Sequence, residues 1–156
     1  MNAPLMIAIT RRLVHRGHTV VRFNFRGTGE STGDHDFGKG EILDVGAEVA
    51  HATGLGGPLG LAGWSFGAAV ALRWLGLQET GIPYAGVAPA GDDLPPQLPP
   101  GPKRIILGTR EQVIDPATLR TYAIELGIDL VLTPGDHFFH GRGDKIGDLV
   151  AQGLEI

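Results

Sequence analysis

Residues 59–75 read Leu-Gly-Leu-Ala-Gly-Trp-Ser-Phe-Gly-Ala-Ala-Val-Ala-Leu-Arg-Trp-Leu, and this stretch decides how the chain is interpreted. Residues 59–64 form a short apolar run, which indicates a buried strand. Residues 67–77 are apolar nearly all round, which is typical of a central helix. The pattern Gly-x-Ser-x-Gly, at 63–67, falls between the two. We therefore predict a strand–turn–helix unit with Ser65 at the turn.

The rest of the chain alternates between apolar runs of strand length and stretches with helical spacing. Helices are predicted at 3–16, 40–53, 67–77, 115–127 and from 143 into the C-terminus, and strands at 19–25, 59–64, 84–88, 104–107 and 129–132. This alternation predicts an α/β fold, a three-layer sandwich around a mainly parallel sheet of about five strands, in a single domain over 1–156. The carboxyl ends of the strands then share one edge, where ligands bind in open α/β sheets.

Composition excludes several classes of function. The 156 residues are 42% hydrophobic and 19% charged, with a net charge of -4 and no cysteine. No basic stretch supports binding to nucleic acid or to an anionic membrane, and no disulfide or thiolate metal site can form. The N-terminus has no signal-peptide pattern, and no apolar run is long enough to span a bilayer. We expect a soluble, cytoplasmic protein.

The setting of Ser65 is that of a nucleophile elbow, in which a serine at a sharp strand-to-helix turn is exposed at the sheet edge. The small residues Gly63 and Gly67, two before and two after the serine, let the chain segments approach each other at such a turn. The backbone N–H of Phe66 would then point to the place where an oxyanion forms. A serine hydroxyl is a weak nucleophile at neutral pH, so it needs a base.

His137 is the predicted base among six histidines. It follows Pro134-Gly135-Asp136 directly after the last predicted strand, on a loop at the same edge as Ser65. The chain order of serine, then acid, then histidine is that of an elbow-type triad. His140 lies nearby and is interpreted as a surface residue.

Two carboxylates qualify as the acid that orients His137. Glu111 and Asp115 both follow the strand predicted at 104–107. Asp115 also precedes Pro116 and is expected to cap the next helix. We favour Glu111 and keep Asp115 as the alternative.

Two other motifs carry less chemistry. The run Gly27-Thr28-Gly29-Glu30-Ser31-Thr32-Gly33 resembles a dinucleotide-binding glycine pattern, but no helix opens within it, so no helix N-terminus would meet a phosphate. Asp34, His35 and Asp36 lie close together without a spacing that fixes metal geometry. We therefore predict neither a cofactor nor a metal.

Three segments resemble a bacterial branch of small α/β-hydrolases described as dienelactone-hydrolase-like. They are Arg22 to Ser31 with its continuation Gly38-Lys39-Gly40-Glu41 to Asp44, the elbow Gly63 to Gly67, and Gly135-Asp136-His137-Phe138-Phe139-His140-Gly141. The resemblance spans nearly the whole chain and places Ser65 and His137 at the nucleophile and base positions. The family usually has Asp where Glu111 stands, and Glu serves as the acid in some hydrolases.

The resemblance also implies that leading strands are missing, so that the expected fold is a truncated α/β-hydrolase fold. The family normally begins with further strands, one of them in the middle of the sheet, and with a loop that supplies a second oxyanion N–H. The strand predicted at 19–25 would then pair with 59–64 directly or borrow a strand from another chain. An uncovered sheet edge invites pairing with a second copy. We expect a homodimer or a rearranged sheet.

Two functions follow as hypotheses. The first is a serine hydrolase that cleaves small ester-type substrates through Ser65, His137 and Glu111, with the Phe66 N–H at the oxyanion. The second is a catalytically weak or inactive, truncated hydrolase fold that serves as a binding or assembly module. The distance between Ser65 and His137 discriminates between them, because only the enzyme needs hydrogen-bond reach.

Overall fold

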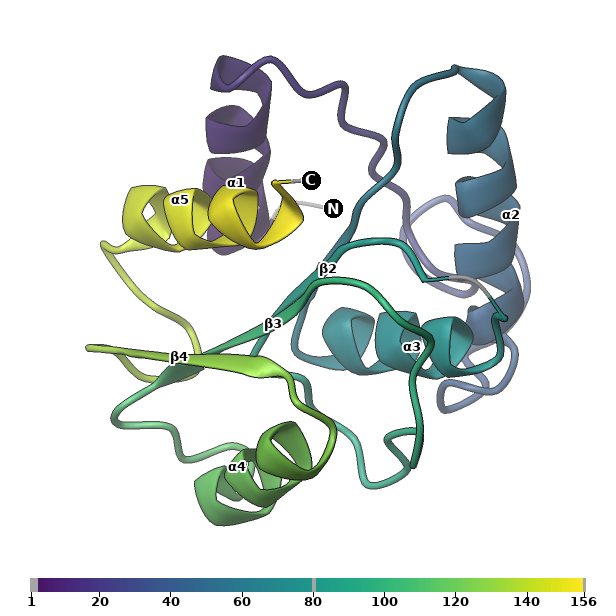
Figure 1. The fold of residues 1–156 in the computed structure, drawn as a ribbon. Coiled ribbons are helices and arrows are strands. Elements are labelled where there is room, and N and C mark those ends of the chain that lie inside the picture. Colours follow the sequence, from purple (N-terminus) through teal and green to yellow (C-terminus); the bar gives the residue numbers. More distant parts are fainter. Residues whose placement is uncertain (1–2, 80, 156) are drawn as a thin grey trace.

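A single parallel sheet organises the part of the chain that the computed structural model describes, residues 3–79 and 81–155 (Figure 1). Its four strands lie in the order β1-β2-β3-β4. They are β1 (Leu61–Trp64), β2 (Tyr84–Val87), β3 (Lys103–Gly108) and β4 (Asp129–Thr133). In the register, Leu61 faces Tyr84, Tyr84 faces Lys103 and Arg104 faces Asp129. The predicted α/β fold with a parallel sheet is confirmed.

Helices cover both faces of this sheet (Figure 1). The helices are α1 (Pro4–His15), α2 (Glu41–Gly54), α3 (Phe66–Gly76), α4 (Pro116–Glu125) and α5 (Gly143–Leu154). α1 and α5 pack together on one face, whereas α3 and α4 lie on the other face and α2 packs on α3. Asp115 caps α4 ahead of Pro116, as the sequence predicts.

The alternation of side chains along β2 and β3 divides the core into two clusters. Val87 and Ile106 face α1 and α5, whereas Tyr84, Ile105 and Leu107 face α3 and α4. Successive side chains of a strand point to opposite faces, so both faces must be covered. All five residues are fully buried, and burial of one large aliphatic side chain stabilises the fold by about 1.5–3 kcal/mol.

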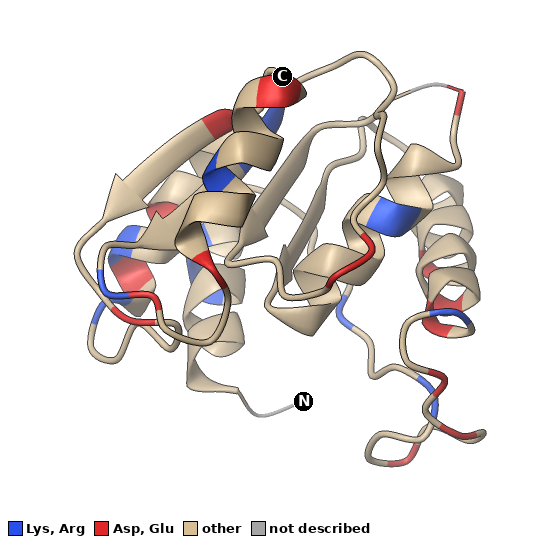
Figure 2. Cartoon of the chain, turned by 90° about the horizontal axis from the view of Figure 1, so that it is seen from below, with Lys and Arg blue, Asp and Glu red and all other residues tan. Residues whose placement is uncertain are grey.

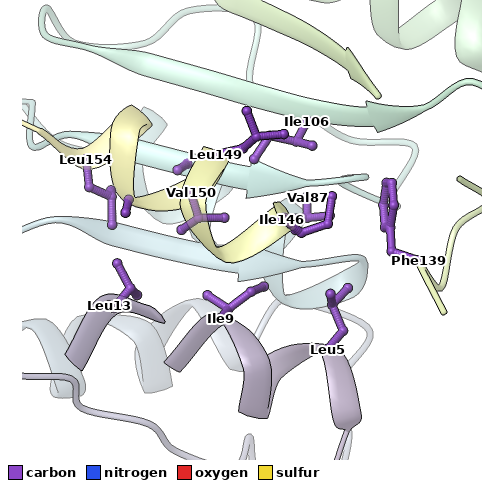
Figure 3. Packing of buried hydrophobic residues seen from close by; sticks show 12 residues of the cluster. Leu5, Ile9, Leu13, Val87, Ile106, Phe139, Ile146, Leu149, Val150 and Leu154 are labelled. Atoms are coloured by element: carbon purple, nitrogen blue, oxygen red, sulfur yellow. The ribbon is translucent and has the colours of Figure 1, made fainter. Parts of the chain in front are cut away.

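The first cluster fixes the two terminal helices on the sheet. Leu5, Ile9 and Leu13 form one stripe of α1 and point toward the apolar side chains of α5 (Figure 3). Phe139, from the loop that carries His137, lies at the end of this cluster. The packing therefore extends up to the carboxyl edge of the sheet.

Charged residues of both signs are interspersed along the ribbon (Figure 2). Where α1 meets α5, the Arg12 Nη2 lies 2.7 Å from the Asp148 Oδ1. Its hydrogen bond lowers the pKa of the Asp148 carboxyl. Ion pairs this exposed contribute little to stability, so apolar packing holds these two helices together.

The predicted strand at 19–25 is not formed, and the sheet of the described residues has four strands rather than about five. Within residues 3–79 and 81–155, the backbone of 19–23 has no backbone hydrogen-bond partner. A cavity of about 500 Å³ lies beside the segment, lined also by α1, α2 and β1. A β-branched sequence favours a strand only where a neighbouring strand supplies the hydrogen bonds, and among the described residues this segment pairs with none.

In the described part of the chain, every helix is too short or too polar to cross a membrane. The predicted homodimer needs a second copy to be tested and stays a prediction.

Candidate active site

Ser65 stands at the turn between β1 and α3. Its φ of 53° and ψ of -124° lie outside the regions that residues with a Cβ ordinarily adopt, a conformation that costs on the order of 1–3 kcal/mol. Hydrogen bonds hold the turn: the Ser65 N–H donates to Val87 O at 2.8 Å, and the Ser65 carbonyl accepts from Ala69 and Ala90 at 3.1 Å each. The sheet and the helix together therefore fix the direction of the Ser65 side chain.

The two glycines of the pattern have different roles. A Cβ on Gly63 would lie 2.7 Å from the Ala68 nitrogen and 2.8 Å from the Gly67 carbonyl carbon, which is too close for any side chain. A Cβ on Gly67 would meet only the Phe25 ring, at 3.7 Å, which is an ordinary contact. Close approach therefore requires glycine at position 63, whereas a Cβ at position 67 would fit in ordinary contact.

His137 reaches Ser65 from the loop that follows β4. Its Nε2 lies 2.8 Å from the Ser65 Oγ, and its Nδ1 lies 3.0 Å from the Glu111 Oε2. The imidazole is buried, with 3% of its side chain exposed. Glu111 accepts at Nδ1, so the tautomer with its proton on Nδ1 leaves Nε2 to accept from the serine hydroxyl.

Glu111 is held by its own turn. Its side chain has no exposed surface, and its Oε1 accepts from the N–H groups of Gln112 at 2.9 Å and Val113 at 2.7 Å. A buried carboxylate needs such partners, because unpaired it would be strongly destabilising. Oε2 remains directed at His137, so the acid has one fixed orientation.

The loop that carries Glu111 and the loop that carries His137 are also bonded to each other. The Thr109 N–H donates to Thr133 O at 3.0 Å, and the Arg110 N–H donates to Gly135 O at 2.9 Å. A Cβ on Gly108 would lie 2.5 Å from the Gly135 oxygen, so the two backbones pass in close contact. The parallel pairing of β3 and β4 therefore continues into both loops.

Asp115, the alternative acid, has a different role. Its carboxylate accepts from the N–H groups of Ala117 at 3.1 Å and Thr118 at 3.2 Å, at the start of α4. The hydrogen bond from the Thr118 hydroxyl, with these two amides, lowers the pKa of Asp115. The structure thus brings Ser65, His137 and Glu111 together and leaves Asp115 as a helix cap. His140 stacks on Phe138, with ring centroids 5.7 Å apart.

Phe66 begins α3, so its N–H belongs to the first helical turn. Such N–H groups have no acceptor within the helix, and the helix dipole places positive potential there. Among the described residues, the Phe66 N–H has no backbone acceptor either. It is available to an anionic oxygen beside Ser65.

The loop 26–40 approaches the site through His35. The His35 ring lies 5.2 Å from the Phe66 ring, and its Nδ1 lies 2.8 Å from the Glu41 Oε1. This loop has no helix within the glycine pattern at 27–33. In the part of the chain that the structure describes, no group of three His, Cys, Asp or Glu side chains is placed to hold a metal ion.

A profile of the alpha/beta hydrolase family matches residues 3–153. The chain belongs to this family. Two solved structures resemble this α/β-hydrolase over 99% of its length. An α/β serine hydrolase homologue from Coxiella burnetii is 28% identical, with a TM-score of 0.84, and the chain covers 78% of it. An α/β serine hydrolase without a lid from Xanthomonas campestris is 32% identical, with a TM-score of 0.82, and the chain covers 73% of it.

A third relative of this α/β-hydrolase chain is an uncharacterised protein of Rickettsia prowazekii, 45% identical over 49 residues. That match spans 31% of this chain and 21% of the relative, so it covers only about a fifth of that protein. The predicted superfamily is confirmed by these comparisons. The dienelactone-hydrolase-like branch stays a prediction.

Sequence reasoning missed the residues that anchor the loop 26–40 of this α/β-hydrolase. Glu41 and Asp44, at the start of α2, both bind the loop. Glu41 is fully buried and accepts from the N–H groups of Asp36 and Gly38 at 2.8 Å each. Asp44 pairs with Arg26 at 2.8 Å. No local pattern signals these contacts, because they depend on how the loop folds back onto α2.

Two carboxyl pKa values follow from this anchoring. Burial acts to raise the pKa of Glu41, but the amide hydrogen bonds outweigh it and lower the pKa overall. The hydrogen bond from the Arg26 side chain lowers the pKa of Asp44. Both carboxylates therefore hold the loop in their ionised form.

Proposed function

We propose that this chain is a serine hydrolase of carboxylesterase type that cleaves small ester-type acyl substrates. One observation carries the proposal: an unbroken series of contacts runs from the Ser65 Oγ to the His137 Nε2 at 2.8 Å and from the His137 Nδ1 to the Glu111 Oε2 at 3.0 Å. This arrangement supplies a nucleophile, a base and an orienting carboxylate in hydrogen-bond reach. The strained elbow and the family membership support the same conclusion.

The reaction follows from these positions. The Ser65 Oγ attacks the ester carbonyl carbon while His137 takes the hydroxyl proton at Nε2. The anionic oxygen of the tetrahedral intermediate accepts a hydrogen bond from the Phe66 N–H, at the positive end of the α3 dipole. His137 returns the proton to the leaving alkoxide, and water then hydrolyses the acyl-enzyme with His137 as base. Glu111 keeps the imidazole in the required tautomer and stabilises the imidazolium.

An open site with small substrates is supported by the segment between β2 and β3. Residues 88–102 contain no helix, so they form no helical lid. The similar Xanthomonas protein is itself described as a serine hydrolase without a lid. Phe66 follows Ser65 directly and the Phe138 ring lies 5.4 Å from the His137 ring, and these aromatic side chains favour an apolar acyl group.

The alternative, a catalytically weak or inactive binding module, predicts no intact catalytic geometry at the site. A hydrolase relic has no reason to keep a buried imidazole within 2.8 Å of the serine or a strained backbone at Ser65. Strain of this kind persists at functional sites because the surrounding structure enforces it. The geometry therefore favours the enzyme.

Labelling with a fluorophosphonate probe tests the proposal. The wild-type protein should be labelled covalently at Ser65, and Ser65→Ala should not. Ser31→Ala is the matched control, because the Ser31 hydroxyl donates to the Asn24 carbonyl at 3.0 Å, whereas the Ser65 hydroxyl is bonded to His137. Labelling of Ser65→Ala, or no labelling of the wild type, would overturn the proposal.

A further inference from the structure

Trp64 links the strand of the nucleophile to the loop of the base. Its indole Nε1–H donates to the His137 carbonyl oxygen at 3.0 Å. An indole N–H is only a donor, so this bond has one direction. Within the described residues, two hydrogen bonds join residues 61–67 to residues 134–142. They are this bond and the Ser65–His137 contact.

The Trp64 ring also borders the imidazole. Its centroid lies 5.8 Å from that of His137, with an angle of 40° between the rings. Phe138 contacts both, at 6.1 Å from Trp64 and 5.4 Å from His137, edge to face in each case. Trp64 thus holds the backbone carbonyl of His137, and Glu111 holds its Nδ1.

We propose that Trp64 is a positioning residue, which sets the separation of the His137 Nε2 and the Ser65 Oγ. The inference rests on the proposed function, because only a hydrolytic site uses this separation. Trp64 is adjacent to the nucleophile in sequence, and its acceptor is the backbone carbonyl of the residue that supplies the base. Any movement of the loop 134–142 away from β1 must first break this bond. A misplacement of about 1 Å in an active site costs on the order of 10²-fold in rate.

The matched variants are Trp64→Phe and Trp74→Phe, which change the chain's only two tryptophans. Trp64→Phe keeps an aromatic ring but removes the donor. Trp74 lies in α3 and packs with the second core cluster, about 13 Å along the helix from Ser65. For p-nitrophenyl acetate, kcat of Trp64→Phe should fall about five- to tenfold with KM within twofold. Trp74→Phe should keep both constants within twofold.

Fluorescence supplies a readout that does not depend on activity. In Trp74→Phe the emission comes from Trp64 alone, and the His137 ring lies 5.8 Å from the Trp64 ring. The Trp64 emission of Trp74→Phe should therefore change when His137→Gln is added. Emission that stays unchanged on His137→Gln would contradict the contact between the two rings.

The outcomes separate the positioning role from the proposed function. A wild-type protein that neither binds the fluorophosphonate nor hydrolyses the ester contradicts the proposed function itself. An active wild type with a folded Trp64→Phe that matches it in kcat and labelling rate overturns the role of Trp64. A loss confined to KM also overturns it, because a positioning residue acts on the chemical step.

Discussion

The carboxyl edge of the sheet and the segment at 19–23 differ in how their backbones are hydrogen-bonded. At the carboxyl edge, the turn of Ser65 is bonded to β2 and the loop of Glu111 is bonded to that of His137. The segment at 19–23 has an apolar, β-branched sequence but no backbone partner among the described residues, and a cavity of about 500 Å³ lies beside it. The elbow forms from its own residues and their neighbours in the sheet, whereas a strand depends on a partner that its own sequence does not supply.

The largest effect expected at the ordered edge concerns the acid. Glu111→Gln should lower kcat for p-nitrophenyl acetate by about 10³-fold, because an amide neither fixes the imidazole tautomer nor stabilises the imidazolium. Asp115→Asn should keep kcat within twofold, because Asn also caps a helix. Steady-state kinetics measure both. A larger loss in Asp115→Asn would assign the acid to Asp115 and refute the role given to Glu111.

A pair of glycine substitutions tests the close backbone approach at the elbow. Gly63→Ala places a methyl group 2.7 Å from the Ala68 nitrogen and should lower the free energy of unfolding by about 1–3 kcal/mol. Gly67→Ala meets the Phe25 ring at 3.7 Å and should change it by less than about 0.5 kcal/mol. Urea denaturation compares the two. Equal losses would show that close approach does not distinguish the glycines.

The loop 26–40 follows the segment at 19–23 in sequence and approaches the site through His35. Acid should weaken the contacts of Glu41 that hold this loop. The pKa of Glu41 is lowered in the folded protein, so its contribution is complete above its ordinary pKa and is lost as the pH falls through the lowered value. Glu41→Gln should reduce the free energy of unfolding at pH 7 by about 1.5–3 kcal/mol, since amide bonds to a charged acceptor are lost. Urea denaturation at pH 7 and at about pH 3 should show this difference shrinking in acid. A difference that grows in acid would contradict the sign.

The smallest effect is expected in the segment without a partner. Val21 is 36% exposed, so Val21→Thr should change the free energy of unfolding by less than about 0.5 kcal/mol. The same change at fully buried Val87 in β2 should cost about 1–3 kcal/mol, because a hydroxyl is placed in the core. Thermal unfolding followed by circular dichroism measures both. A comparable cost at Val21 would mean that 19–23 is packed in solution as a strand, which would remove the contrast.

Local patterns were enough to predict most of the fold and the residues that meet at the site. The short apolar run at 59–64 indicates β1, and the residues at 67–77, apolar nearly all round, indicate α3. The positions of Glu111 and His137 after successive strands place both at one edge, where the structure brings them together. Such predictions succeed because parallel strands end at the same edge whatever lies between them.

The remaining features depend on contacts between distant segments. The bond from Trp64 to the His137 carbonyl spans 73 positions, and Glu41 binds a loop whose path no periodicity describes. The prediction of a strand at 19–25 was wrong for the same reason, because a strand forms only where a second segment pairs with it. Sequence patterns therefore indicate which residues carry chemistry, while the supporting contacts require the fold.

A double-mutant comparison of the nucleophile and the base tests the central claim most directly. If Ser65 and His137 act as one unit, each alanine substitution should lower kcat/KM for p-nitrophenyl acetate by at least about 10³-fold, and the double variant should lose no more than either single variant. Losses that multiply in the double variant, or a single substitution that leaves kcat/KM unchanged, would contradict a catalytic unit built on Ser65.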